Sequence, residues 1–344
     1  MERILAIQIK RIGDLILTAP AIRLLRRHRP DAHITLVTAD AAGQLASCIP
    51  GIDEHLNYRS GKANSAIWAT LLSEHYDVSL DFDGTDRSVA MSLVAGATKR
   101  CAYTKRAVGF PRSTIFTHTN SASLKKLHTI DHMCALLETM DIIPETRPEP
   151  LQLEIPASIQ KKSQQILQQH DFSPDTEFAL IHPGTARSEK YWSPADWATV
   201  IDHLVTGRNL PIVITGGSDD EEMAHITSIQ SSCSREARNQ IVDLSGTISL
   251  AQTAYVISQA HITLGVDTAA MHLASAFERP QIVLYGPTNP YHWRPLNQQA
   301  QVILAGHDQP LGEEDFQIKT PQTSMDLITP QQVIKAIKQQ LELI

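Results

Sequence analysis

GVDTAAMHLASAFERPQIVLYGPT, residues 265–288, is the stretch that decides the fold of this chain. The apolar run 262–266 predicts a buried strand that stops at Asp267, and the small and apolar residues after it predict a helix to about Phe277. A second apolar strand, 281–285, leads into Gly-Pro-Thr. Strand, helix and strand in this order build parallel α/β sheets, in which ligands bind where a strand's carboxyl end feeds a helix N-terminus. The stretch therefore predicts an α/β fold with a ligand edge after Asp267.

Asp267, Thr268 and His272 each allow a structural and a functional interpretation. Asp and Thr are good helix N-caps, so both side chains could serve only to start the helix. His272 follows Thr268 by four residues and so lies on the same helix face. Alone, it fits a buried core histidine. Together at one strand end, the three side chains favour an anion site, because the helix dipole and first-turn N–H groups attract negative charge.

Strands and helices alternate along the whole chain, which predicts βαβ units and parallel sheets. In the first half we expect strands at 4–9, 33–37, 78–82 and 99–103, and helices near 20–27, 41–48, 65–74, 88–95 and 130–140. In the second half we expect strands at 178–182, 211–215, 241–244, 262–266 and 281–285, a helix capped by Ser193 with Pro194 at its first position, and a last helix at 330–341 whose packing the sequence leaves open.

A proline-rich segment separates the two halves. Residues 143–150 contain three prolines, which continue neither a helix nor a central strand. A chain of 344 residues also favours two domains over one. We therefore expect an N-terminal domain at 1–150 and a C-terminal domain at 151–344, with a ligand cleft between the two lobes. For the last helix, at 330–341, packing on the N-terminal lobe is one of the arrangements that the sequence leaves open.

Composition describes an ordinary globular protein and excludes several classes. Hydrophobic residues make up 42% and charged residues 19% of the chain. The four cysteines form no CxxC pair, so neither a zinc site nor a disulfide framework is expected. The N-terminus lacks a signal-peptide layout and no apolar run is long enough for a bilayer, so we expect a cytoplasmic protein. The net charge of −7 argues against a nucleic-acid partner.

The charge is nevertheless uneven along the chain. From Arg87 through Ile130 there is no Asp or Glu, although eight cations fall there: Arg87, Lys99, Arg100, Lys105, Arg106, Arg112, Lys125 and Lys126. Such a window predicts a surface for a phosphorylated or otherwise anionic partner. A solvated, lysine-rich loop is the alternative.

Asp14 is the candidate general base of the first half. The first strand ends in Lys10-Arg11-Ile12-Gly13-Asp14, where Gly13 permits a tight turn or a close approach of the backbone. A carboxylate just past a strand's carboxyl end is suited to accept a proton in a cleft. A turn or capping role is the structural alternative.

Three strand ends of the second half carry small and polar residues that suit a nucleotide. The first runs into a Gly/Thr/Ser loop with cations, 183–192, which is suited to phosphate oxygens. The second runs into Gly216 and Gly217 and then acids up to Glu222, which could meet ribose hydroxyls. The third runs into Ser245-Gly246-Thr247-Ile248. With the edge after Asp267, they predict a nucleotide site along one sheet edge.

These motifs together resemble the family 9 glycosyltransferases, the ADP-heptose:lipopolysaccharide heptosyltransferases. The matching features are Gly13-Asp14 with Pro20, His182-Pro183-Gly184-Thr185 with Lys190-x-Trp192, Leu244-Ser245-Gly246, Asp267-Thr268 with His272, and Tyr285-Gly286-Pro287-Thr288. The resemblance implies the GT-B architecture, with two Rossmann-like lobes, the acceptor in the first and the nucleotide sugar in the second. It implies no metal and no other cofactor. It also implies inverting transfer of heptose from ADP-L-glycero-β-D-manno-heptose to a hydroxyl of the lipopolysaccharide inner core.

The resemblance assigns expected roles to individual residues. Asp14 matches the catalytic base and Lys190 the diphosphate-binding lysine. Donor-binding positions are Thr185, Ala186, Arg187, Glu222, Ile248, Asp267, Thr268, Ala269 and His272, with Ile248 against the adenine. The end of the first strand and the acid-free window, in place of the resemblance, supply the expected acceptor-binding positions, which are Lys10, Arg11, Gly13, Arg87, Lys105, Arg106 and Arg112. Two departures from the family pattern are Ala269, where glycine is usual, and Phe82-Asp83 within the acceptor-side segment 81–88. A positive φ at Ala269 would cost about 1 kcal/mol or more.

The expected partners are ADP-heptose and a lipopolysaccharide core acceptor that carries phosphate, with peripheral contact at the cytoplasmic face of the inner membrane. Alternatives are transfer of another nucleotide sugar, a protein acceptor, a nucleotide-sugar epimerase on the same fold, and a non-catalytic binding module. The presence of both Asp14 and Lys190 argues against the last of these.

Overall fold

The computed structural model describes residues 1–145 and 148–342. Its contacts divide the chain into two compact units, Met1–Glu154 and Ile155–Ile344, hereafter unit 1 and unit 2. The division lies four residues beyond the expected boundary at 150. Within the proline-rich segment, positions 146 and 147 lie outside the described residues. No helix in the described part of the chain combines the length and the apolar character that crossing a bilayer requires.

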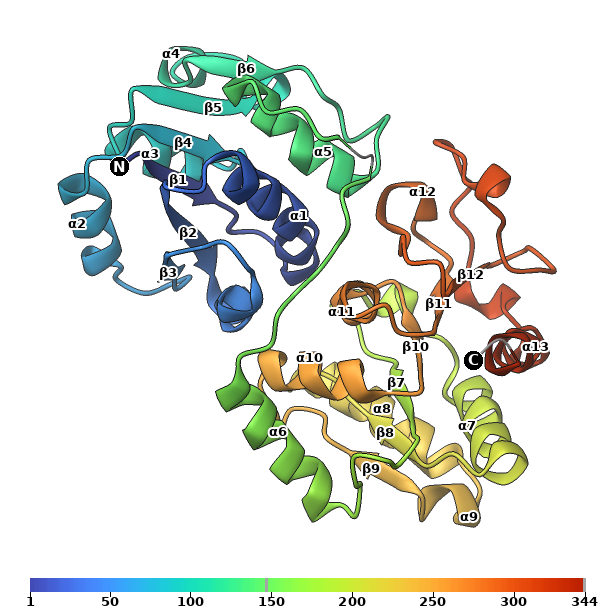
Figure 1. Ribbon diagram of the computed structural model, residues 1–344. Coiled ribbons are helices and arrows are strands. Elements are labelled where there is room, and N and C mark those ends of the chain that lie inside the picture. The colour runs from blue at the N-terminus through green and yellow to red at the C-terminus, as the bar shows by residue number, and fades with distance from the viewer. Residues whose placement is uncertain (146–147, 343–344) are drawn as a thin grey trace. The chain divides into compact units, whose positions relative to one another are not determined.

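Unit 1 is a six-stranded parallel sheet in the order β3-β2-β1-β4-β5-β6. Its strands are β1 (Arg3–Ile7), β2 (His33–Ala39), β3 (Glu54–Tyr58), β4 (Val78–Asp81), β5 (Lys99–Tyr103) and β6 (His118–Asn120). Its helices are α1 (Ile12–His28), α2 (Ser65–Ser73), α3 (Asp86–Val94), α4 (Arg112–Ile115) and α5 (Thr129–Ala135). Helix α1 packs with α5 and α2 packs with α3, and the two pairs cover opposite faces of the sheet (Figure 1).

Helix α1 begins eight residues before the helix that the sequence predicts near Pro20. Arg11 is extended, at φ −82° and ψ 156°, and α1 starts at Ile12. Pro20 lies inside the helix and is buried, so one backbone hydrogen bond is lost there. The apolar residues on either side of it, such as Leu17 and Leu24, are almost fully buried. This burial compensates for the proline, and it places Gly13 in a helical turn instead of the predicted tight turn.

Unit 2 repeats the architecture, with the strand order β12-β11-β10-β7-β8-β9. Its strands are β7 (Ala179–His182), β8 (Ile212–Ile214), β9 (Ile241–Asp243), β10 (Ile262–Val266), β11 (Gln281–Tyr285) and β12 (Ala300–Leu304). Its helices are α6 (Ala157–Gln169), α7 (Pro194–Arg208), α8 (Asp220–Ser232), α9 (Arg235–Arg238), α10 (Leu250–Gln259), α11 (Ala269–Ala276), α12 (Pro290–Trp293) and α13 (Pro330–Leu341). Helix α13 packs on α7, β11 and β12, and it therefore belongs to unit 2.

The core of unit 2 is built around two tryptophans. Trp192 and Trp197 are fully buried, with ring centroids 5.0 Å apart in an edge-to-face arrangement. The indole N–H of Trp192 donates to the Ile328 carbonyl at 3.0 Å, which ties the loop after β7 to the segment before α13. Such pairs stabilise the core beyond the burial of their area. They also fix the start of α7, two residues after Trp192, where Pro194 is the first helical residue as predicted.

Both sheets have the strand order 3-2-1-4-5-6 of a dinucleotide-binding fold when the strands of each unit are numbered from one. Chain direction across the sheet reverses between β1 and β4 in unit 1 and between β7 and β10 in unit 2. At such switch points the loops after the two strands diverge and leave room for a ligand. The strand order therefore predicts one ligand-binding edge in each unit, and Asp14 and Asp267 lie at these edges.

Candidate active site

An ion pair bridges the switch point of unit 2. Strands β7 and β10 are neighbours, with His182 opposite Gly265, so the loops that follow them run side by side. Lys190, at the end of a short 3-10 turn after β7, reaches across to Asp267 after β10. Its Nζ lies 2.7 Å from Asp267 Oδ2 and 2.8 Å from the Asp267 carbonyl oxygen. The two side chains are only 11% and 10% exposed. This is a largely buried, charge-assisted pair.

The position of Asp267 excludes the structural alternative, in which its side chain caps helix α11. The N-cap residue of α11 is Thr268, at φ −143° and ψ 173°, and the Asp267 carboxylate does not cap the helix. That carboxylate accepts from Lys190 and, at 2.9 Å, from the Thr288 hydroxyl after β11. Thr288 therefore belongs to the edge, although its sequence position predicted only a place in the Gly-Pro-Thr motif. Asp267 acts as the anchor that holds Lys190 in place.

Two buried polar groups near this pair have no partner among the described residues. They are the Thr268 hydroxyl and Nδ1 of His272. Burial lowers the pKa of His272 to about 4, with Asp267 and Lys190 acting in opposite directions on it. His272 is therefore neutral near pH 7. Ala269 is the first residue of α11 and is not among the described residues with positive φ, so the alanine causes no strain of that kind.

The glycine turns after β7 and β8 are filled by Glu222. Its Oε1 accepts from the Gly217 amide at 2.8 Å. A Cβ atom at Gly184 would lie 1.7 Å from the same oxygen, so only glycine allows this approach. Burial raises the pKa of Glu222. The carboxylate that was expected to meet a ribose thus also has a structural role, because it joins the two loops.

The remaining donor positions lie along the same edge with different surroundings. Thr185 is half-buried and Ala186 is exposed in the loop after β7. The guanidinium of Arg187 pairs with Glu189, at 2.7 Å from Nε to Oε1. Ile248 is half-buried just before α10, two strands away beyond β9. Lys190, Asp267 and His272 form the close group, and Ile248 lies at the far end of the edge.

Asp14 occupies the corresponding edge of unit 1, in the first turn of α1. Burial raises the pKa of its carboxyl, and Asp83 adds to that rise, while Lys10 and Arg11 lower it. A carboxylate with a raised pKa is a stronger base than an exposed one. The raised pKa fits the predicted role of Asp14 as a general base. The N-cap residue of α1 is Arg11, so Asp14 is not the cap.

The segment 81–88 builds the wall beside Asp14. The fully buried Asp81 accepts from the amides of Asp83 and Gly84 at 2.9 and 2.8 Å, and from Ser88 Oγ at 3.0 Å. Asp83, also buried, receives the Lys10 ammonium at 2.9 Å, and its carbonyl oxygen lies 2.6 Å from the same nitrogen. Burial raises the pKa of Asp81 to about 6. Lys10 is thus fixed by Asp83.

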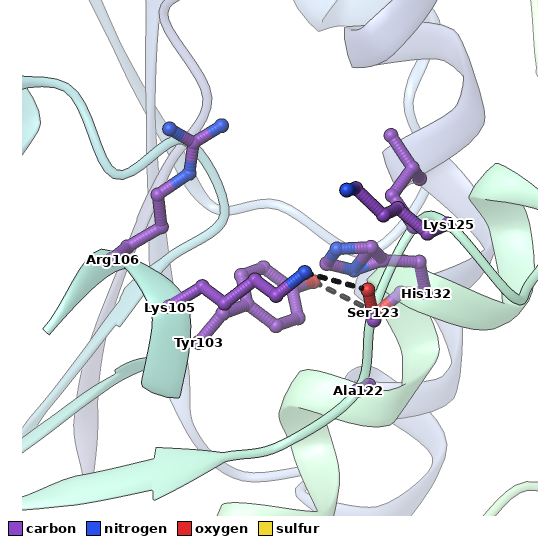
Figure 2. A pocket seen from close by; sticks show the side chains of 8 residues that line it. Tyr103, Lys105, Arg106, Ala122, Ser123, Lys125 and His132 are labelled. Atoms are coloured by element: carbon purple, nitrogen blue, oxygen red, sulfur yellow. Dashed lines mark hydrogen bonds between the residues drawn. The ribbon is translucent and has the colours of Figure 1, made fainter.

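A pocket of about 400 Å³ opens at the carboxyl end of β5 in unit 1. Six polar side chains line it: Tyr103, Lys105, Arg106, Ser123, Lys125 and His132. Lys105 Nζ donates to Ser123 Oγ at 3.2 Å. In Figure 2, the Lys105 side chain extends toward Ser123 beside the His132 ring, whereas the Arg106 guanidinium points away from these residues. Lys105 and Arg106 were predicted from the sequence as acceptor-binding residues, whereas Lys125 was noted only within the acid-free window and His132 was not singled out.

The other cations of the acid-free window do not join this pocket. Arg87 lies over the Tyr58 ring, 4.6 Å from its centroid. Arg112 donates to the Gly84 carbonyl at 2.9 Å and pairs with Asp86. Arg100 donates to two backbone carbonyls. The window therefore combines structural arginines with a cationic pocket, and its role as a surface for an anionic partner stays a prediction.

The comparisons with known proteins show the family of this chain and support its fold. Residues 65–321 match the model of "Glycosyltransferase family 9 (heptosyltransferase)". The chain belongs to this family. Lipopolysaccharide heptosyltransferase 3 of Escherichia coli is 24% identical over 306 residues, covering 86% of both chains. The crystal structure of a family 9 glycosyltransferase from Veillonella parvula is similar at a TM-score of 0.83, with 21% identity over 100% of this chain and 98% of the other.

A second solved structure, E. coli ADP-heptose lps heptosyltransferase II, has a TM-score of 0.80 and 20% identity over 100% of this chain and 99% of the other. The prediction of an α/β GT-B architecture with Rossmann-like parallel sheets is confirmed. The protein is a glycosyltransferase of the heptosyltransferase family, and the relatives that it matches include lipopolysaccharide heptosyltransferases. The roles of individual residues stay predictions.

Proposed function

We propose that this protein transfers a heptose from ADP-L-glycero-β-D-manno-heptose to a hydroxyl of the lipopolysaccharide inner core, with inversion at the anomeric carbon. The observation that carries the proposal is the Lys190–Asp267 pair at the switch point of unit 2. A lysine ammonium has three N–H donors, and Asp267 takes two of them. The third is left for an oxygen of the ADP diphosphate, as the family membership of the chain supports.

Loss of ADP places negative charge on the leaving diphosphate, and fixed cations and donors stabilise such charge strongly. Lys190 supplies the cation. The N-terminus of α11 supplies a positive dipole end. The Thr268 hydroxyl, which has no partner among the described residues, and the neutral ring of His272 supply hydrogen-bonding groups. Ile248 covers one face of the adenine. No residue in this set requires a metal ion.

Asp14 removes the proton from the acceptor hydroxyl as that oxygen attacks the anomeric carbon. The C–O bond to ADP breaks as the new glycosidic bond forms, and the proton goes to the Asp14 carboxylate. General-base catalysis of this kind contributes roughly 10²–10⁴-fold. The raised pKa of Asp14 supports this role, and the Lys10–Asp83 pair sets the electrostatic surroundings of the base.

Unit 1 receives the acceptor, and a lipid-linked acceptor brings the enzyme to the cytoplasmic face of the inner membrane. The loop 104–112 supports membrane contact, since Val108 and Phe110 are 69% and 89% exposed. Lys105, Arg106 and Arg112 flank these two side chains. Apolar side chains between cations are suited to an anionic bilayer surface.

A donor panel tests the transfer reaction. ADP-heptose, UDP-sugars and GDP-sugars are offered with truncated core acceptors, and the released nucleotide and the glycosylated product are measured. We expect glycosylated product with ADP-heptose as the donor and none with the UDP-sugars or GDP-sugars. Product from a UDP- or GDP-sugar would contradict the donor assignment, transfer to protein would contradict the acceptor, and a changed sugar without any acceptor would indicate an epimerase.

Vesicle sedimentation tests the membrane contact. We expect the protein to bind vesicles rich in phosphatidylglycerol more strongly than phosphatidylcholine vesicles, and Phe110→Ser to weaken that binding. Leu72→Ser is the matched control, because Leu72 is 71% exposed on α2 outside the loop. Equal binding of parent and Phe110→Ser would show that the loop does not contact the bilayer.

A further inference from the structure

A surface segment after β12 is tied to the turn that follows β11. The segment comprises residues 312–323, hereafter the strap, and the turn comprises residues 286–289. All twelve strap residues are described, and their only regular element is a short 3-10 turn at Glu313–Asp315. Most of the strap side chains are exposed, so the strap has little core of its own. Its position therefore depends on its contacts with the rest of unit 2.

Asn289 makes the central tie between turn and strap. Its Nδ2 donates to the carbonyl oxygens of Gln317 and Ile318 at 3.0 and 2.9 Å. Its Oδ1 accepts from the Tyr291 amide at 2.9 Å and so caps the short helix α12. An asparagine amide has two N–H donors, and both are used on the strap. The side chain therefore joins two segments of unit 2 in place of contacting a ligand.

Two further ties lie on either side of this one. The Arg294 guanidinium lies over the Phe316 ring of the strap, 4.3 Å from its centroid, in a cation–π contact. The Thr323 amide donates to the Gly286 carbonyl at 3.2 Å. A Cβ atom at Gly286 would lie 3.0 Å from the Thr323 carbonyl oxygen, so the two backbones approach each other closely there. The strap therefore holds the turn 286–289 at both of its ends.

The turn reaches Lys190 through Asp267. Thr288 lies between the two held ends, and its hydroxyl donates to Asp267 Oδ2 at 2.9 Å. The same carboxylate oxygen accepts from Lys190 Nζ at 2.7 Å. A shift of the turn would withdraw the Thr288 hydroxyl and free the carboxylate to rotate, and the lysine bound to it would follow. A lysine side chain that is ordered before the ligand arrives loses less freedom on binding than a mobile one.

We propose that the strap positions Lys190 for the diphosphate, and that Asn289 is the positioning residue that connects the strap to Thr288, Asp267 and Lys190. The proposal rests on the proposed function only for the contact between Lys190 and the diphosphate. It predicts that a side chain with no ligand contact of its own sets part of the affinity for ADP.

Calorimetric titration of the full-length protein with ADP tests the proposal without any transfer of sugar. Asn289→Ser keeps an oxygen that caps α12, because serine is a good N-cap, but it removes the amide that reaches the strap. We expect this variant to raise the Kd for ADP about three- to tenfold, within the range that one hydrogen bond produces.

Asn297→Ser is the matched control. Asn297 is also half-buried, and its amide donates to the Arg279 carbonyl at 3.0 Å. This tie joins the loops before β12 and β11, at the amino ends of the strands, whereas Asn289 and Asp267 follow the carboxyl ends. Asn297→Ser should therefore leave the Kd for ADP unchanged. Urea unfolding of both variants measures whether their losses of stability are comparable.

A double-variant cycle shows whether the effect passes through Lys190. In the Lys190→Met background, Asn289→Ser should change the Kd for ADP less than about twofold, since no ammonium is left to position. Thr288→Val removes the donor in the middle of the series, so it should weaken ADP binding as Asn289→Ser does. Asn289→Ser added to Thr288→Val should again contribute less than about twofold. Should Asn289→Ser fail to fold, Thr288→Val in the same cycle decides the question.

An unchanged Kd in Asn289→Ser, with weakened binding in Lys190→Met, would overturn the role of the strap and leave the proposed function intact. Equal weakening by Asn289→Ser with and without Lys190, or equal weakening by Asn297→Ser, would assign the effect to a general loss of packing and overturn the proposal as well. An unchanged Kd in Lys190→Met would overturn both the diphosphate contact and its positioning.

Discussion

Replacing Lys190 by methionine tests the buried pair of unit 2 most directly. The substitution keeps a long side chain but removes the charge, and it leaves Asp267 with its hydrogen bond from the Thr288 hydroxyl. Removing one partner of a buried ion pair costs about 3–5 kcal/mol. Because the pair retains about a tenth of its surface exposure, we expect the lower end, about 3 kcal/mol of unfolding free energy. The loss should fall on unit 2.

The same substitution should weaken ADP binding. A charge-assisted hydrogen bond contributes about 1.5–3 kcal/mol, which corresponds to roughly a 10- to 150-fold increase in Kd. Urea unfolding followed by tryptophan fluorescence measures the stability, because three of the four tryptophans, Trp192, Trp197 and Trp293, lie in unit 2. Isothermal titration calorimetry measures the affinity for ADP.

Lys335→Met is the control, since Lys335 is an exposed lysine on α13 whose ammonium donates to the Gln309 side chain at 2.9 Å. We expect it to change stability by less than about 0.5 kcal/mol. The double variant Lys190→Met/Asp267→Asn should lose less unfolding free energy than the two single variants lose in sum. Each single variant already removes the interaction between Lys190 and Asp267, so the sum counts that interaction twice. A loss below about 1 kcal/mol in Lys190→Met with an unchanged ADP Kd would refute both the buried pair and its contact with diphosphate.

Three further predictions concern other parts of the site. Asp14→Asn should lower turnover at least roughly a hundredfold and leave the Kd for ADP unchanged, and turnover within tenfold of the parent would exclude Asp14 as the base. Gly184→Ala should destabilise unit 2 by about 1–3 kcal/mol, since its Cβ collides with Glu222, and a stable variant with intact ADP binding would show that the loop can move aside. Burial lowers the pKa of His182 and His272 to about 4, against about 6.5 unfolded, so the unfolded chain binds more protons between these values. Stability of unit 2 should therefore fall by about 2 kcal/mol per histidine from pH 7 to pH 5, and urea unfolding of His182→Asn should show a correspondingly smaller drop.

The central strands of both sheets could be predicted from the sequence because burial on two faces makes them continuously apolar. Strands β5, β10 and β11 have the predicted bounds, and the other predicted strands differ by one or two residues at their ends. The outer strands β3, β6 and β12 were missed. Strand β3 reads Glu-His-Leu-Asn-Tyr and is only half-buried throughout, so it lacks the apolar signal of a central strand. Strand β6 has only three residues.

The candidate sites were predictable where one strand end holds several of their residues. The residues after β10 are of this kind, since Asp267 and His272 lie five positions apart. The pocket of unit 1 was harder to predict, because Tyr103, Ser123 and His132 come from three different segments. Sequence spacing gives no sign that the loop before α5 returns to the end of β5. Asp83 was predicted only as a departure from the family pattern. Its ion pair with Lys10 joins residues that are distant in the sequence, so it could be seen only in the structure.

The repeated strand order has a consequence for how members of this family diverge. Each unit has its own sheet and its own ligand edge, and the chain passes between the units once, at Glu154 and Ile155. Substitutions that retune one edge need not disturb the packing that forms the other. Acceptor range and donor choice can then evolve at separate rates. If the proposed division of roles holds, a chimaera joined at this boundary, with residues 1–154 from one relative and 155–344 from another, should take its acceptor specificity from the first parent and its donor specificity from the second.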